Sequence, residues 1–156
     1  MNQNVKVICF GLTLLGIAAI YFGTVQFNKS QEAKKWPQAK GVVVFSRVNS
    51  HYSTGQHATL MFSPDVRYQY SVNGQVYYSK SISFGDYSSS IYSQIKNVVD
   101  KYYVNEDISV YYDPANPAQA VLEPGKIGGI FIIFAVGALF LVVGLMGLLG
   151  SFRQTN

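Results

Sequence analysis

Apolar and polar residues alternate along Asp65–Ile82, with the sequence DVRYQYSVNGQVYYSKSI. Before the Asn73-Gly74 pair, every second residue is β-branched or aromatic: Val66, Tyr68, Tyr70 and Val72. This period of two is typical of a strand with one buried face and one solvated face. Asn-Gly favours a type I′ turn, because both central residues of that turn need a positive φ. The segment therefore predicts a β-hairpin, whose apolar face other elements must cover because a lone hairpin is marginally stable in water.

Two long runs without charge lie on either side of this segment, at residues 7–28 and 127–150. About 20 apolar residues suffice to cross a bilayer. Lys6 and Lys29 flank the first run, and Lys126 and Arg153 flank the second. We therefore expect transmembrane helices over residues 5–28 and 126–150, a juxtamembrane segment over 29–38 and a polar tail over 151–156.

A cleaved signal peptide is the competing interpretation of the first run. Its apolar part would be shorter, and a small-x-small cleavage site would follow it. Here Ala18-Ala19 is followed by further apolar residues, which favours a retained span.

Small residues recur at helical spacing in both runs. They are Gly16, Ala19 and Gly23 in the first run, and Gly137, Gly144 and Gly147 in the second. Small side chains allow membrane helices to approach closely. The pattern predicts that the two spans pack against each other, and it leaves open that they dock on a partner's helix or on a second copy.

The chain between the spans, residues 39–125, predicts a small α+β domain of about five strands and one helix. Residues 39–48 form the first predicted strand and 49–56 a loop. Residues 57–62 are expected to extend the first strand or pair with it, and Pro64 is expected to end this segment before the hairpin. After a serine-rich turn that supplies an N-cap, an apolar stripe predicts an amphipathic helix of 12 to 14 residues packed on the sheet: Ile91, Ile95, Val98, Val99 and Tyr102. Two short strands, residues 108–112 and 118–122, complete the domain.

Every tyrosine except Tyr21 falls between the two spans. Tyrosine is enriched in binding surfaces, because it combines a large contact area with a polar tip. We take as the candidate interaction surface the side chains of Tyr68, Tyr70, Tyr77, Tyr78, Tyr111 and Tyr112. Trp36 is expected to anchor the domain at the membrane interface, where tryptophan is common.

Charge and chemistry exclude several classes of function. The net charge of +4 is spread along the chain, whereas nucleic-acid binding needs a concentrated basic face. The single cysteine, Cys9, forms no disulfide within the chain. His51, His57 and Asp65 lack the spacing of a metal site, and no nucleophile or phosphate-binding motif occurs. We expect no enzymatic activity, no cofactor and no metal.

Four motifs resemble a widespread bacterial family of two-span membrane proteins with a domain of unknown function. They are Trp36-Pro37-x-Ala39-x-Gly41-x-Val43, Tyr68-x-Tyr70-x-Val72-x-Gly74-x-x-Tyr77, Val110-Tyr111-Tyr112-Asp113-Pro114-x-Asn116-Pro117 and Leu122-Glu123-Pro124-Gly125. The resemblance covers residues 36–125 and departs from the family by an insertion at 49–62. It implies the architecture and brings no catalytic residue.

The sequence thus favours a non-enzymatic two-pass membrane protein, in a bacterial inner membrane, whose domain binds a protein partner. One version is an accessory subunit of a larger membrane complex or a homo-oligomer. The alternative is an immunity-type protein that neutralises a toxin at the membrane. Positive charges flanking the spans leave the side of the domain open, because a loop of this length crosses a membrane regardless of its charge.

Overall fold

The computed structural model describes residues 3–55, 57–85 and 88–153. The chain forms two compact units, one of residues 1–28 with 129–156 and one of residues 29–128. The first unit is helical, and the second is an antiparallel sheet with a helix on it. The predicted α+β class, with an apolar helix on each side of a five-stranded sheet domain, is confirmed.

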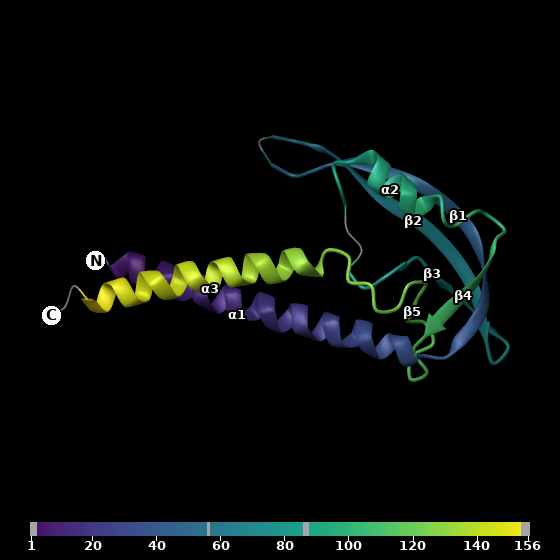
Figure 1. Cartoon of the computed structure of the whole chain (residues 1–156), viewed down its shortest axis with the longest axis horizontal. Coiled ribbons are helices and arrows are strands. Elements are labelled where there is room, and N and C mark those ends of the chain that lie inside the picture. Colours follow the sequence, from purple (N-terminus) through teal and green to yellow (C-terminus); the bar gives the residue numbers. More distant parts are fainter. Residues whose placement is uncertain (1–2, 56, 86–87, 154–156) are drawn as a thin grey trace. The chain divides into compact units, whose positions relative to one another are not determined.

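The helical unit consists of α1, Gln3–Glu32, and α3, Ile130–Arg153 (Figure 1). Both are long and apolar enough to cross a membrane. Large apolar side chains point outward from both, among them Val7, Phe22, Phe131 and Leu149. The last residues of α1 belong to the sheet unit, where a 3₁₀ turn at Ala33–Lys35 ends the helix just before Pro37. α3 begins later than the apolar run, because Gly128 and Gly129 disfavour helix.

Glycines set how closely the two helices pack. A Cβ added at Gly16 would lie 2.8 Å from the backbone of both Gly137 and Leu141. Farther along the pair, Gly144 faces Thr13 and Cys9, Gly147 faces Cys9, and Gly23 faces the ring of Phe134. As the residue numbers along α1 increase, the numbers of the facing residues in α3 decrease, so the two helices run antiparallel. Ala19 packs against Gly137, and all six small residues named from the sequence therefore lie at this contact.

The sheet has the order β3-β2-β1-β4-β5, and all neighbours are antiparallel. The strands are β1 (Gln38–Tyr52), β2 (Leu60–Val72), β3 (Gln75–Ser79), β4 (Asp107–Tyr112) and β5 (Ala120–Val121). The helix α2, Tyr92–Val99, lies over the long β1–β2 ribbon (Figure 1).

The predicted hairpin is present between β2 and β3. Asn73 and Gly74 both have positive φ, 52° and 81°, as a type I′ turn requires. The alternation also holds, because Val66, Tyr68, Tyr70 and Val72 are all buried.

β1 and β2 are longer than predicted. Residues 49–52, expected in a loop, continue β1 and pair with Leu60–Ser63. Pro64, expected to break the chain, lies within β2 opposite Val48. The N–H of Phe62, two residues earlier, points away from β1 to the carbonyl of Ser89. Pro64 therefore has its missing N–H on the side away from β1, which is where a strand tolerates proline.

α2 is shorter than predicted, with eight residues instead of 12 to 14. Its N-cap is Ile91, not a serine, although the backbone N–H of Ile91 donates to Ser89 Oγ. The predicted apolar stripe of this helix is confirmed at its central positions, because Ile95 and Val99 are buried in the core. Ile91 is 50% exposed, and Tyr102 follows the helix in a turn.

The core lies between the sheet and α2, and Gly41 occupies its tightest point. A Cβ at Gly41 would lie 2.7 Å from Val110 Cγ2 and 2.8 Å from Gln69 O, so only glycine fits there. The buried members of the core are Val43, Val66, Tyr68, Tyr70, Val72, Ile82, Ile95, Val99, Val110, Ala120 and Leu122.

Replacing Gly16 by leucine should separate the helices, because the atoms it would meet in α3 are backbone and cannot rotate away. Cys9, the only cysteine, is buried against Gly147 and reports this change. We expect an apolar maleimide to label Cys9 severalfold faster in Gly16→Leu than in the unchanged protein, both in detergent. Gly11→Leu is the matched control, since a Cβ there meets nothing within 4 Å. Equal labelling rates in the two variants would contradict the packing.

Candidate functional site

The sheet has one face that α2 does not cover, here called the outer face. Strand register places on it the residues that alternate with the core positions. They are Val42, Phe45, Arg47, Asp65, Arg67, Gln69, Val76 and Tyr78, together with Val44 at an irregularity in the β1–β2 register. Tyr78 is 69% exposed and Val76 is 54% exposed.

Two arginines and one aromatic ring form the centre of this face. The guanidinium carbons of Arg67 and Arg47 lie 4.9 and 5.0 Å from the centroid of the Phe45 ring. Arg67 also binds Asp65 through two hydrogen bonds, from Nε and Nη2, each 2.9 Å long. These hydrogen bonds hold the pKa of the Asp65 carboxyl below its ordinary value, with smaller contributions from the charges of Arg67, Arg47 and Lys80.

The cluster carries an excess of positive charge. In the part of the chain that the structure describes, Arg47, Arg67 and Lys80 lie near a single carboxylate, that of Asp65. Both arginine side chains are more than half exposed, and exposed ion pairs add only about 0.2–1 kcal/mol to stability. The cluster therefore matters chiefly as a cationic, partly aromatic surface that an anionic group can reach.

Two hollows flank Tyr78 on this face. One, of about 740 Å³, runs past Asp65, Arg67 and Lys80 beside the end of β3. The other, of about 320 Å³, is lined by Val42, Gln69 and Val76 among others. Tyr78 lines both. The Tyr78 side chain therefore separates a hollow lined by charged residues from a more apolar hollow.

β3 is also an edge strand of the sheet. Within the described residues, no strand pairs with its outer edge. An open edge presents backbone N–H and C=O groups that an extended segment of another chain can pair with. The outer face and this edge together form the candidate site.

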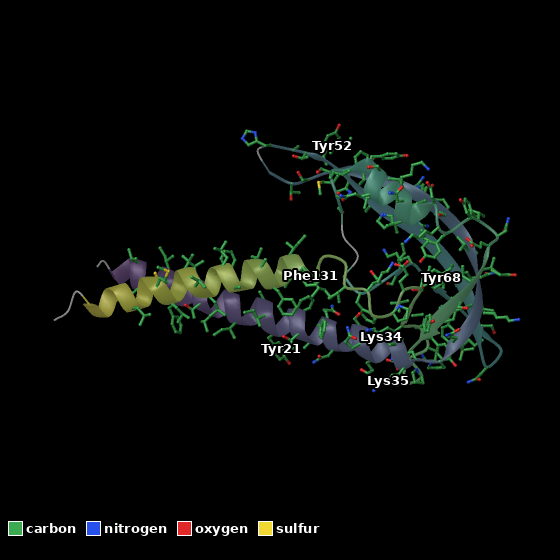
Figure 2. The ribbon with its side chains drawn as sticks, in the orientation of Figure 1. Tyr21, Lys34, Lys35, Tyr52, Tyr68 and Phe131 are labelled. Carbon is green, nitrogen blue, oxygen red and sulfur yellow. The ribbon has the colours of Figure 1, made fainter. Side chains whose placement is uncertain are left out.

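The structure corrects part of the predicted tyrosine surface. Tyr68 and Tyr70 are core residues, 0% and 2% exposed, and cannot take part in such a surface. Tyr77 stacks on Tyr70 with ring centroids 5.7 Å apart, and Tyr112 packs against the core. Of the six, Tyr78 and Tyr111 lie on the outer side of the sheet, and Tyr111 is only half-buried. Figure 2 shows Tyr68 inside the domain, whereas Tyr52 is exposed at the far end of β1.

Sequence reasoning missed Phe45, Arg47 and Arg67. The signal was available for Arg67, because it alternates with the buried positions of β2 and so had to face outward. For Phe45 and Arg47 there was no such signal, since the register shift between Val43 and Phe45 moves them to the outer face.

Trp36 is also placed differently from the prediction. It is 9% exposed, and its ring packs edge-on against Phe84 with centroids 5.9 Å apart. The side chain is therefore a packing residue of the sheet unit, not an exposed anchor. His51, His57 and Asp65 form no metal-binding group among the described residues.

The buried phenols have backbone partners. Tyr70 donates to Pro117 O at 2.5 Å, and the Tyr68 hydroxyl lies 2.8 Å from Ser81 O and 3.1 Å from Ala120 O. Burial, together with the neighbouring Tyr77, raises the pKa of Tyr70 to about 12. Burial and the nearby Glu123 likewise raise the pKa of Tyr102.

Stability should therefore fall as the pH rises from about 10, the ordinary value for tyrosine, towards 12. In that window the unfolded chain loses the Tyr70 proton while the folded chain retains it, so rising pH favours unfolding. Tyr70→Phe should have a shallower slope, by up to about 1.4 kcal/mol per pH unit. Denaturant unfolding between pH 9 and 11.5 measures this, with Tyr78→Phe as a control for an exposed phenol. Identical slopes for Tyr70→Phe and the unchanged protein would refute the assignment.

Comparison with known proteins identifies a family for the sheet unit. The family model described as "Domain of unknown function (DUF3592)" matches residues 39–127, which covers β1 to β5 and α2. No curated protein matches the chain. Since the model covers more than half of the chain, the protein belongs to the DUF3592 family.

Proposed function

We propose that this chain is a non-enzymatic two-pass membrane protein whose outer face binds a protein partner. The partner that fits is an extended, acidic segment, paired with the open edge of β3 and contacting the cations beside it. Following the resemblance, the setting is a bacterial inner membrane, and the role is that of an accessory subunit of a membrane complex.

Charge complementarity supports this choice of partner. Among the described residues, Arg47, Arg67 and Lys80 outnumber the carboxylate of Asp65, so an acidic side chain would find donors there. The Tyr78 ring next to them offers a large contact area with little side-chain entropy to lose. Aromatic and arginine side chains are also those enriched at protein interfaces.

The residues that carry the family resemblance support a role without chemistry. Gly41 allows close packing, Gly74 and Gly125 have positive φ, and Val43 and Val110 are buried. The Asp113 carboxylate accepts from the backbone N–H of Ala115 and so builds the turn. Each of these residues has a task in the fold.

Photo-crosslinking in cells tests the surface directly. We expect a photoreactive phenylalanine analogue at Tyr78 to give one discrete adduct with a partner. The same analogue at Tyr103, a tyrosine of similar exposure at 66% outside the outer face, should give none. Arg47→Glu combined with Lys80→Glu should abolish the Tyr78 adduct, because it reverses the charge while retaining the Arg67–Asp65 pair.

Lys96→Glu, a charge reversal on α2, serves as the matched control and should leave the adduct intact. The captured peptide should be acidic. Adducts of equal yield at Tyr78 and Tyr103, or an adduct that survives the double reversal, would show that the outer face is not the binding surface.

A further inference from the structure

A second concave site lies on the opposite side of the sheet. It is a cavity of about 270 Å³, bounded by β2, α2 and the segments 82–83 and 123–128. Its volume is close to the lower end of the range for small-molecule sites, about 300–1,000 Å³. Pro64 also borders the larger hollow of the outer face, whereas the other residues that line the cavity line neither of the two hollows described above.

The walls of the cavity are apolar and fixed. Pro64 comes from β2, Ile95 and Val98 from α2, and Ile82 and Ile127 from the two segments. Backbone hydrogen bonds join these segments, from Glu123 N to Ile82 O at 2.7 Å and from Gly128 N to Phe84 O at 3.2 Å. Backbone pairing thus holds these two segments of the cavity wall together.

Three charged groups line the same cavity. Lys126 Nζ lies 2.8 Å from Glu123 Oε2, and Lys101 Nζ lies 3.8 Å from Glu123 Oε1. Both lysine side chains are more than half exposed, whereas Glu123 is 22% exposed. An ammonium has three donors, so the shared carboxylate leaves donors on both lysines for a second anion. Glu123 holds the two lysine ammonium groups near one another. The two lysines and Glu123 together carry one net positive charge.

We propose that this cavity binds an anionic lipid, with the headgroup phosphate on Lys101 and Lys126 and the first carbons of an acyl chain between Ile82, Val98 and Ile127. At about 270 Å³, the space is large enough for part of an acyl chain and too small for a whole one. Apolar walls beside two cations match a molecule with a phosphate at one end and hydrocarbon next to it.

The sequence supports a membrane lipid as the molecule that carries this phosphate and hydrocarbon. Ile127 and Gly128, which line the cavity, come immediately before Gly129 and the apolar helix α3. If α3 spans the membrane, as the proposed function holds, these residues are tied to the segment that enters the bilayer. Basic residues beside a membrane span attract anionic headgroups, and Lys126 lies four residues before α3.

Trp36 provides the measurement, because it is the only tryptophan and packs on Phe84, which is bridged to Ile127. The purified full chain in maltoside detergent is titrated with dihexanoyl-phosphatidylglycerol, with dihexanoyl-phosphatidylcholine and with inorganic phosphate alone. We expect a saturable change in Trp36 fluorescence with phosphatidylglycerol, weaker binding of phosphatidylcholine and no competition by millimolar phosphate.

Lys101→Gln combined with Lys126→Gln should weaken phosphatidylglycerol binding at least about tenfold, since hydrogen bonds to charged groups are lost. Lys40→Gln combined with Lys96→Gln removes the same charge at lysines that do not line the cavity and should not weaken binding. Val98→Phe fills the cavity and should abolish binding with the lysines in place, and circular dichroism confirms that each variant is folded. Absence of saturable binding, equal binding by all variants, or full competition by phosphate would each overturn the lipid site. None of these results bears on the Tyr78 adduct, so the two proposals fail separately.

Discussion

The sheet domain depends on hydrogen bonds from two buried phenols of β2 to backbone carbonyls far away in the sequence. Tyr68 and Tyr70 are neighbours on the buried face of β2. The Tyr70 hydroxyl donates to Pro117 O, and the Tyr68 hydroxyl lies 2.8 Å from Ser81 O and 3.1 Å from Ala120 O. The rings supply apolar area to the core, and because each hydroxyl has a carbonyl partner, neither is buried unsatisfied. Such an unsatisfied group costs about 1–3 kcal/mol, so the hairpin and the turn stabilise each other.

This link explains what the family resemblance means physically. One motif contains the tyrosines, and another contains the Asp113–Pro117 turn that carries one of their acceptors. The turn is closed by its own bonds, from Asn116 N to Asp113 O and from Asp113 N to Gln119 O. Two motifs far apart in sequence thus form one unit of structure. The surfaces proposed to bind a partner and a lipid are built largely from residues outside these motifs.

Sequence patterns predicted helices and strands correctly where a local signal alone determines the structure. The β2–β3 hairpin follows from alternation and Asn-Gly, and the apolar helices follow from length and composition. Predictions failed where long-range pairing overrode a local signal, as at Pro64, which is tolerated because its missing N–H lies on the side away from β1. The tyrosine surface was also predicted wrongly in part. Residue type suggested a binding surface, but Tyr68 and Tyr70 lie on the same strand face as Val66 and Val72, which is buried. The cationic cluster on Phe45 depends on a register shift that no local pattern encodes.

The most direct measurement is amide hydrogen exchange across residues 113–122 in the full chain, comparing the unchanged protein with a variant in which Tyr68 and Tyr70 are both phenylalanine. That change removes only the two hydroxyls and keeps the rings. The account predicts that the turn amides, those of Asn116 and Gln119 among them, lose protection while the β1–β2 ribbon retains it. Unchanged protection in the turn would contradict the view that the phenols hold it in place.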